Sequence, residues 1–357
     1  MSKFHSLKIK EIRKETPDAV SVKFDVPDTL STEFSYSAGQ YINLKLPVKG
    51  QEEIRSYSLS SCLQTDNEWR VAIKKLDGGK VSTHFNEEAR VGDEIQVSAP
   101  EGSFVVQNLG EEGREHVFFA AGSGITPVRS MIKAVLHSEP KSRCVLFYGN
   151  RDEEHVIFKK ELDQLAEENP ERFKVHYVFS RMENAREQYG EHAEGRIDGE
   201  KAMFLIRKFT ALETRPVFYM CGPAGMMNAV EDALQTLRVS KDDVKKEYFE
   251  TPDEPVSKEA SSAEPVHSKA VIILDEEEFE VDIEPGVTVL DACTNDDIDA
   301  PYSCRGGVCS TCMAKVEEGK ASMRLNYVLT EDEVEEGYIL TCQAEPLTPK
   351  IKVDFDA

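Results

Sequence analysis

The segment Cys304-Arg-Gly-Gly-Val-Cys309-Ser-Thr-Cys312 is the most informative part of this sequence for the structure of its C-terminal region. Four residues separate its first two cysteines and two separate the next pair, and Cys342 follows after a gap of twenty-nine residues. This is the spacing of plant-type [2Fe–2S] ligation. The two glycines allow the loop to approach an anionic cluster and to direct backbone N–H groups at its sulfurs. The spacing therefore predicts a [2Fe–2S] cluster held by these four cysteines.

Other uses of cysteine fit the chain less well. Zinc usually takes two separate Cys-x2–4-Cys knuckles, whereas here Cys304, Cys309 and Cys312 lie in one cluster and Cys342 has no cysteine partner nearby in the sequence. Eight cysteines in 357 residues are too sparse for a disulfide scaffold, which a reducing cytosol would also oppose. Cys293 lies upstream on an expected helix, and we interpret it as a core residue.

The charge of the chain is strongly acidic, with 66 acidic and 43 basic side chains and a net charge of −23. Residues 269–357 hold 21 acidic against 7 basic side chains, which is most of this excess. Such a chain is repelled by phosphate backbones and anionic lipids, so nucleic acid and membrane surfaces are not expected partners. No stretch approaches eighteen apolar residues, and the first residues lack the apolar run of a signal peptide, so we expect no membrane insertion and a cytoplasmic location.

Composition also indicates where the domains divide. Residues 251–268 hold three prolines and four serines and few large apolar side chains, which is typical of a linker, although a long surface loop would look similar. We therefore predict a first domain over 1–110, a second over 111–250, the linker at 251–268 and a third domain over 269–357.

Hydrophobic periodicity predicts a different fold for each domain. Short alternating runs such as Ala19–Phe24 and Trp69–Ile73, interrupted by Gly and Pro, indicate an antiparallel β-barrel. From about residue 114, buried-type strands alternate with helical stretches, which predicts a doubly wound α/β domain with a parallel sheet. The last domain has a hairpin-like start and little helix beyond Val289–Asn295 and Glu331–Glu335, and we expect an α+β fold of the β-grasp type.

Two motifs of the α/β domain suggest a nucleotide site. Gly122-Ser-Gly124-Ile-Thr126-Pro127 follows a strand and opens a helix, where backbone N–H groups and the helix N-terminus attract a pyrophosphate. Cys221-Gly222-Pro223 ends another strand of the sheet, at the edge where such sheets bind ligands. A tight turn and a buried core cysteine remain the alternative interpretations.

Two motifs of the barrel suggest a flavin. In Arg55-Ser-Tyr57-Ser58, the arginine could neutralise a diphosphate, the tyrosine could stack on a ring, and the serine could bond a flavin edge. The segment 78–83, Gly-Gly-Lys-Val-Ser-Thr, offers backbone N–H groups and hydroxyls to a phosphate. Each motif alone could be ordinary, but the four in this order along the chain are difficult to obtain by chance.

With these motifs the chain resembles the ferredoxin–NADP reductase superfamily with a plant-type ferredoxin fused at the C-terminus, and the resemblance covers essentially the whole sequence. Within it, the chain is most similar to the reductase components of phenylacetyl-CoA epoxidase (ring-1,2 monooxygenase) systems, while steroid 9α-hydroxylase reductases have a similar layout. The segments that carry this likeness are 4–7, 195–201, 301–312, 326–333 and 342–348.

The resemblance implies roles for individual residues. FAD would be held at its ring and diphosphate by Arg55, Tyr57 and Ser58, and at its pyrophosphate by Gly79, Val81 and Ser82. The nicotinamide nucleotide would lie against Gly122, Gly124 and Thr126, with Cys221, Gly222 and Pro223 near the point of hydride transfer. Ser58 and Cys221 would then be the catalytic side chains. Glu247-x-Phe249 matches a terminal strand motif whose aromatic ring lies near the flavin.

Two arginines bear on the choice of electron donor. Arg151 and Arg181 each follow a strand of the parallel sheet and could pair with the 2′-phosphate of NADPH, although exposed loop arginines are common. We favour NADPH over NADH.

Together, the motifs and the resemblance predict an NAD(P)H-dependent oxidoreductase that passes electrons from NAD(P)H through FAD and [2Fe–2S] to a terminal oxygenase. The oxygenase, expected to be of the phenylacetyl-CoA epoxidase type, would dock on the acidic ferredoxin domain. The alternatives are a general reductase that serves a steroid hydroxylase, a desaturase or a P450, and a subunit that senses redox state or binds partners without turnover.

Overall fold

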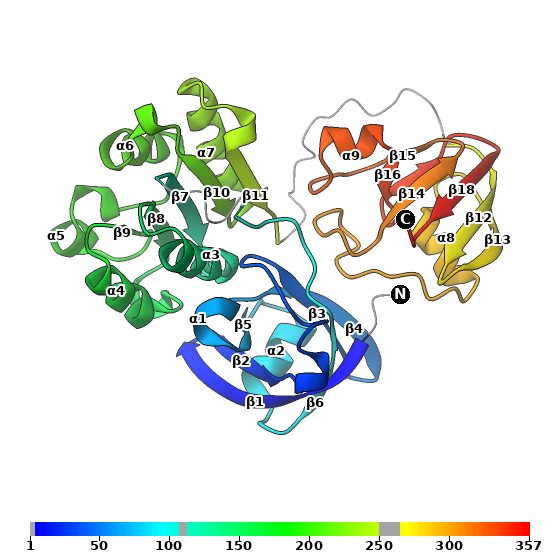
Figure 1. Ribbon diagram of the computed structural model, residues 1–357, viewed down its shortest axis with the longest axis horizontal. Coiled ribbons are helices and arrows are strands. Elements are labelled where there is room, and N and C mark those ends of the chain that lie inside the picture. Colours follow the sequence, from blue (N-terminus) through cyan, green and yellow to red (C-terminus); the bar gives the residue numbers. More distant parts are fainter. Residues whose placement is uncertain (1–3, 107–112, 250–264) are drawn as a thin grey trace. The chain divides into compact units, whose positions relative to one another are not determined.

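The computed structural model describes residues 4–106, 113–249 and 265–357 and divides into two compact units (Figure 1). The larger unit is formed by His5–Glu53 and Tyr57–Phe249, and the smaller contains Phe4, Ile54–Ser56 and the described residues from 265 onward. The predicted boundary at 110/111 lies outside the described residues. So does the predicted linker, except for its last four residues, of which Ser268 already opens a strand.

An antiparallel sheet with the strand order β4-β3-β6-β1-β2-β5 forms the first part of the larger unit. Its strands are β1 (Phe4–Thr16), β2 (Ala19–Asp25), β3 (Tyr41–Val48), β4 (Gln51–Ser58), β5 (Trp69–Lys74) and β6 (Glu94–Ser98). A backbone bridge from Leu59, directly after β4, to Val71 of β5 joins the two edge strands. The sheet thus closes, and the predicted antiparallel barrel is confirmed.

Two short helices, α1 (Leu63–Asp66) and α2 (Lys80–Glu87), follow β4 and β5. From the sequence, residues 78–83 were predicted to form a phosphate-binding loop, and α2 was not predicted. Its helical face is evident in the folded chain, where Val81 and Phe85, four residues apart, are both buried in the barrel core.

A parallel sheet with the strand order β11-β10-β7-β8-β9 forms the second part of this unit. Its strands are β7 (Glu115–Ala121), β8 (Arg143–Asn150), β9 (Phe173–Phe179), β10 (Val217–Cys221) and β11 (Val244–Glu247). The helices are α3 (Ile125–Ser138), α4 (Lys159–Glu168), α5 (Ala185–Tyr189), α6 (Gly199–Phe209) and α7 (Ala224–Thr236). Residues 116–120 of β7 are all buried, as expected for a central strand covered on both faces. The predicted doubly wound α/β fold is confirmed.

The direction of winding reverses at β7, which has β10 on one side and β8 on the other. The carboxyl ends of β7 and β10 therefore form the switch point at which open α/β sheets bind ligands. α6 was not predicted. α4 starts directly after Phe158, whose positive φ of 62° no α-helix accommodates.

A mixed five-stranded sheet with the order β13-β12-β18-β14-β16 forms the smaller unit, beside a two-stranded sheet of β15 and β17. The strands are β12 (Ser268–Leu274), β13 (Glu277–Ile283), β14 (Met313–Glu318), β15 (Ala321–Met323), β16 (Tyr338–Leu340), β17 (Ala344–Pro346) and β18 (Lys350–Asp354). The parallel pair β12–β18 lies inside otherwise antiparallel neighbours. Helices α8 (Val289–Asn295) and α9 (Glu331–Glu335) have the predicted bounds, and Cys293 is a buried core residue as predicted.

Among the described residues, no helix combines the length and the apolar character that crossing a membrane requires.

Candidate functional site

Three side chains from distant parts of the sequence meet at the carboxyl edge of the parallel sheet. Cys221 ends β10 and is paired in register with Glu247 of β11. Ser58, the last residue of β4 in the barrel, donates a hydrogen bond from its hydroxyl to Glu247 Oε2 at 3.2 Å. Ser58 and Cys221 are both buried. The structure thus brings together the two predicted catalytic side chains and adds a carboxyl group.

Burial determines the protonation of this group. Glu247 is partly accessible as a residue, yet its carboxyl is desolvated, which raises its pKa to about 8 against a smaller opposing effect of the Ser58 hydroxyl. Burial first, and then the neighbouring Glu247, raise the pKa of the Cys221 thiol well above its usual value. At neutral pH both groups therefore hold a proton, and the Cys221–Glu247 pair is uncharged. From the sequence, Glu247 was predicted only as part of a strand motif, and its contact with Ser58 was not foreseen.

The glycine loop before α3 approaches the same strand end. A Cβ on Gly124 would lie 2.0 Å from the carbonyl oxygen of Cys221, so only glycine fits there. Gly122 has a positive φ of 55°. The Thr126 hydroxyl donates to the carbonyl of Ser123 at 2.9 Å and closes the first turn of the helix. This close-packed turn at a helix N-terminus fits the pyrophosphate cradle that was predicted from the sequence.

A lysine of the barrel lies beside this loop. A Cβ on Gly122 would be 3.5 Å from Lys74 Nζ, and burial lowers the pKa of Lys74. Asp18 lies 3.9 Å from the same Nζ and forms an ion pair with Arg151. Lys74 thus brings a cation to the glycine loop. It was not predicted from the sequence because a lysine at a strand end is common in any sequence.

The remaining predicted nucleotide residues lie around the same edge. A Cβ on Gly222 would lie 2.7 Å from Met226 Cε, and Pro223 is the N-cap of α7. Arg181 follows β9 with an exposed side chain, whereas Arg151 is engaged by Asp18. Phe249, two residues beyond the end of β11, is 39% exposed and so presents an uncovered ring.

The predicted flavin residues lie on two barrel elements. Tyr57 of β4 is half-buried and meets Phe85 of α2 edge-on, with 6.4 Å between ring centroids. Arg55, on the same strand, is exposed, and its guanidinium donates to the Ile54 carbonyl at 2.7 Å. Tyr57 thus offers an aromatic face on which a flavin ring could stack, and Arg55 offers a cation for the diphosphate.

The start of α2 is the second flavin element. Gly79 is its N-cap, and a Cβ there would lie 2.5 Å from Ser82 Oγ. The Ser82 hydroxyl accepts from the Leu76 N–H at 3.2 Å, and Val81 and Ser82 are both buried. The turn is therefore compact and lacks room for a side chain at Gly79, which fits close approach by a phosphate.

The four cysteines of the predicted cluster lie in two pairs. The Cys309 thiol donates to Cys304 Sγ at 3.1 Å, and the thiols of Cys312 and Cys342 interact likewise. In the described part of the chain, no group of three or more His, Cys, Asp or Glu side chains is placed to hold a single metal ion. Two pairs of sulfurs suit a centre with two irons, each of which takes two cysteine ligands.

The backbone of the cysteine loop supports the same assignment. The Cys309 thiol, with backbone N–H groups of Gly306 and Val308, lowers the pKa of Cys304. The Gly306 N–H lies 3.4 Å from Cys304 Sγ. Gly307 has a positive φ of 72°, and a Cβ there would lie 3.0 Å from the Leu325 carbonyl. The loop is thus wrapped tightly, with N–H groups aimed at sulfur, as the two glycines led us to predict.

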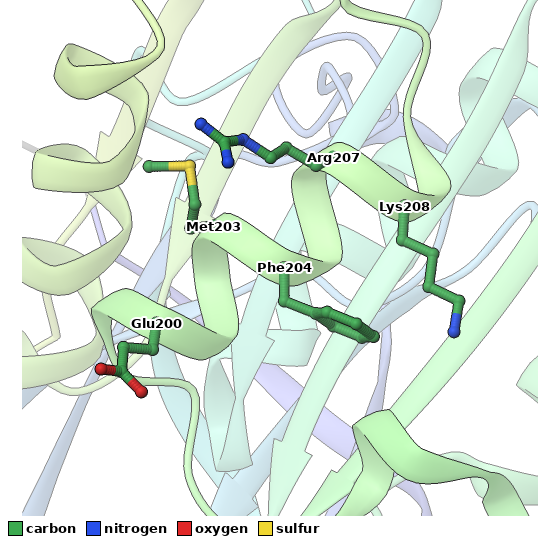
Figure 2. Close-up of a pocket in the computed structure, with 5 residues that line it drawn as sticks. All are labelled: Glu200, Met203, Phe204, Arg207 and Lys208. Carbon is green, nitrogen blue, oxygen red and sulfur yellow. The ribbon is translucent and has the colours of Figure 1, made fainter.

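A separate hollow lies on α6, away from all of these motifs. It has a volume of about 520 Å³ and is lined by Glu200, Met203, Phe204, Arg207 and Lys208 (Figure 2). Lys208 Nζ lies 4.9 Å from the centroid of the Phe204 ring, an arrangement that a cation and an aromatic face favour. No predicted site residue lies in this hollow.

Three protein-family models match this chain. Residues 6–106 match the oxidoreductase FAD-binding domain, residues 118–232 the oxidoreductase NAD-binding domain, and residues 272–347 the 2Fe-2S iron-sulfur cluster binding domain. The order of the three matches is the order of the three predicted domains.

Characterised proteins resemble the chain over its whole length. A component of the 1,2-phenylacetyl-CoA epoxidase of Escherichia coli (strain K12) is 36% identical over 358 residues, which cover 100% of this chain and 99% of that protein. The ferredoxin reductase component of 3-ketosteroid-9-alpha-monooxygenase from Rhodococcus rhodochrous is 32% identical, covering 98% of this chain and 96% of that protein.

Solved structures share the fold. Phthalate dioxygenase reductase, described as a modular structure for electron transfer from pyridine nucleotides to [2Fe–2S], matches with a TM-score of 0.57 and 23% identity and covers 99% of this chain and 98% of its own. An intact type IV self-sufficient cytochrome P450 monooxygenase matches with a TM-score of 0.70 and 21% identity, and the chain spans 41% of that protein. Because both structures are less than 25% identical to this chain, the comparison shows only that they share its fold.

Proposed function

This chain belongs to the family of oxygenase reductases that join FAD-binding, NAD-binding and 2Fe-2S domains, and from that premise we propose that it serves an oxygenase of the phenylacetyl-CoA epoxidase type. It is an NAD(P)H-dependent oxidoreductase in which electrons pass from NAD(P)H through FAD and [2Fe–2S] toward an oxygenase. What we propose is the identity of the oxygenase, the preference for NADPH over NADH, and the residues that bind the cofactors and take part in hydride transfer.

We place hydride transfer at this edge of the sheet because Ser58, Cys221 and Glu247 meet there in a buried contact. FAD supplies a two-electron acceptor and the [2Fe–2S] cluster a one-electron exit when both are bound. Ser58 positions the Glu247 carboxyl, which holds a proton near neutral pH. Cys221 closes the edge with a small, neutral side chain, so that a nicotinamide ring can approach without meeting a charge.

The binding residues proposed for the flavin are Arg55, Tyr57, Ser58, Gly79, Val81, Ser82 and Phe249. Those for the nicotinamide nucleotide are Gly122, Gly124, Thr126, Arg181, Gly222 and Pro223, to which the position of Lys74 adds a cation. The cluster ligands are Cys304, Cys309, Cys312 and Cys342. The corresponding domains are 1–110, 111–250 and 269–357, with 251–268 as linker.

Docking of the oxygenase on the ferredoxin domain is supported by charge. Residues 269–357 carry 21 acidic against 7 basic side chains. α9 and the residue that follows it, 331–336, contribute five of the acidic ones, and four of these are exposed. A basic patch on the partner would be attracted to this surface and its approach accelerated.

The test is reconstitution with two purified oxygenases. With NADPH, this protein should support turnover of a phenylacetyl-CoA epoxidase oxygenase at least tenfold faster than that of a 3-ketosteroid 9α-hydroxylase, the alternative that the relative at 32% identity favours. Equal or reversed rates would contradict the proposed partner.

The same assay separates an enzyme from a redox sensor. Cys309→Ser should lose the cluster and all oxygenase turnover while it keeps NADPH-dependent reduction of ferricyanide, which takes electrons from flavin. Cys293→Ala, which removes a buried thiol of the same domain outside the cluster set, should keep both activities. A wild-type protein that reduces no artificial acceptor would favour the sensor.

A further inference from the structure

Two consecutive carbonyls of the barrel are held by two consecutive side chains of α3. The Arg129 guanidinium donates to the carbonyl of Ser60, and the Ser130 hydroxyl donates to the carbonyl of Ser61. Ser60, Ser61 and Ser130 are fully buried, and Arg129 is 7% exposed. These are therefore water-excluded hydrogen bonds between the barrel and the nucleotide-binding part of the same unit.

Arg129 is held from its other sides as well. It forms an ion pair with Glu161 of α4, and its Nη1 lies 4.0 Å from Asp66 Oδ2 in α1. Its guanidinium carbon lies 4.7 Å from the centroid of the Phe158 ring. A planar guanidinium suits such a site because it can bond in its plane and stack on a ring at the same time.

The barrel loop that accepts these bonds is itself rigid. The Ser60 hydroxyl donates to the Arg70 carbonyl at 3.0 Å and the Ser61 hydroxyl to the Glu68 carbonyl at 2.9 Å. The Tyr36 hydroxyl lies 2.8 Å from Ser61 Oγ. A movement of α3 against this loop would therefore break bonds and could not be absorbed by the loop.

On each side of this contact, the chain reaches within a few residues the edge at which Ser58, Cys221 and Glu247 meet. On the barrel side, Ser60 follows Ser58, which bonds Glu247. On the other side, Arg129 lies five residues after Gly124, whose α-carbon is packed on the Cys221 carbonyl. The contact thus joins the residues directly after the strand proposed to carry the flavin to the helix that follows the loop proposed to carry the nucleotide.

We propose that Arg129 and Ser130 are positioning residues that set the separation of flavin and nicotinamide and thereby the rate of hydride transfer. The proposal rests on the site residues of the proposed function but not on the identity of the oxygenase. Neither residue is assigned a contact with either cofactor. A misplacement of about 1 Å at a reacting pair can lower a rate by roughly two orders of magnitude, so loss of the contact should affect rate more than affinity.

The test is single-turnover reduction of the bound flavin by NADPH in the full-length protein. The variants are Arg129→Met, which keeps the apolar stem, and the milder Ser130→Ala. The matched control is Lys133→Met, which removes an ion pair to Asp66 one turn farther along the same interface. The limiting rate should fall about 10- to 100-fold in Arg129→Met and less in Ser130→Ala. The dissociation constant for NADPH and the flavin content should stay near wild type, and Arg129→Lys should restore part of the rate.

Three outcomes would overturn the proposal. The first is an unchanged limiting rate of flavin reduction in both variants, and the second is a weaker NADPH affinity at an unchanged rate. The third is an equal fall of the limiting rate in Lys133→Met, which would indicate general loosening of the interface. If Arg129→Met does not fold, the limiting rates and NADPH affinities of Ser130→Ala and Arg129→Lys test the proposal in its place. Failure of the wild type to reduce its flavin with NADPH or NADH would instead count against the proposed function.

Discussion

Two arginines with the same position in the sequence pattern have different surroundings in the folded chain. Arg151 follows β8 and is paired with Asp18, a residue of the turn between β1 and β2. Arg181 follows β9, and its side chain is exposed. A cation already neutralised by a carboxylate attracts a phosphate less, so the structure favours Arg181 as the partner of a 2′-phosphate.

Arg181→Ala should therefore raise the Michaelis constant for NADPH about five- to thirtyfold, which corresponds to about 1–2 kcal/mol for a partly solvated charge pair. The value for NADH should change little because NADH has no 2′-phosphate. Steady-state kinetics with both nucleotides measure the effect. Arg151→Ala is the control and should change the NADPH/NADH ratio less than Arg181→Ala does; the reverse ranking would show that our choice of arginine is wrong.

A second prediction for a single residue concerns the effect of Glu247 on the stability of the fold at different pH values. Its pKa is raised by burial from 4.5 to about 8, so the folded state holds its proton over a range in which the unfolded chain releases it. Stability due to this group is present below pH 4.5 and is lost as the pH rises through 8. Relative to Glu247→Gln, the wild type should lose roughly 2–4 kcal/mol between pH 5 and pH 9.

Urea unfolding of both proteins at pH 5, 7 and 9 measures this difference. The matched control is Glu231→Gln on the neighbouring α7, which removes a carboxyl that is ion-paired with Lys246 of β11. A Glu247→Gln variant with the same pH profile as the wild type would mean that this carboxyl ionises normally.

At the scale of secondary-structure elements, two histidines connect β9, the 3₁₀ turn Glu191–Ala193 and α6. His176 of β9 lies 3.9 Å from Phe209 at the end of α6 and 5.1 Å from His192 in the turn, measured between ring centroids. Burial first, and then the charges of His192, Lys174 and Lys208, lower the pKa of His176 to about 4. The packing of α6 on this side of the sheet therefore requires a neutral His176.

Acid should loosen this packing. The unfolded chain takes up the proton near pH 6.5 and the folded chain only near pH 4, so stability falls as the pH is lowered between these values. From pH 7 to pH 5 the wild type should lose about 1–2 kcal/mol through this residue. His176→Phe should lose less over the same range in thermal or urea unfolding. His137→Phe, at an exposed position on α3, should behave like the wild type; equal acid sensitivity of all three proteins would argue against the mechanism.

At the scale of the whole molecule, the uneven distribution of charge leads to a prediction about the encounter with the proposed oxygenase. The C-terminal quarter of the chain holds most of the excess negative charge. Screening over about 10 Å at 0.1 M salt implies that attraction to a basic oxygenase is strongest at low ionic strength. Glu335→Gln/Glu336→Gln, at exposed positions of α9 and directly after it, should slow cluster-to-oxygenase electron transfer about two- to tenfold at low salt and little at high salt.

Stopped-flow oxidation of the reduced protein by its oxygenase measures this effect. Glu277→Gln/Glu280→Gln removes the same charge from exposed positions of β13 and is the control. An equal slowing by both pairs would show that net charge matters and that α9 does not form the docking surface.

Local patterns were sufficient to predict the domain folds and the two helices α8 and α9, because hydrophobic period is a property of neighbouring residues. The prediction of the cysteine set rests in the same way on ligand spacing. The helix α2 was missed since a short helix with few apolar positions gives a weak periodic signal. The helix α6 was missed since its continuous apolar run at 202–206 could equally be a buried strand. The contacts of Glu247 with Ser58, of Lys74 with the glycine loop and of Arg129 with Ser60 join residues 189, 48 and 69 positions apart. Such contacts, and the pKa shifts that follow from them, depend on how the barrel packs against the parallel sheet. Packing across long separations in sequence leaves no local pattern, so only the folded chain reveals it.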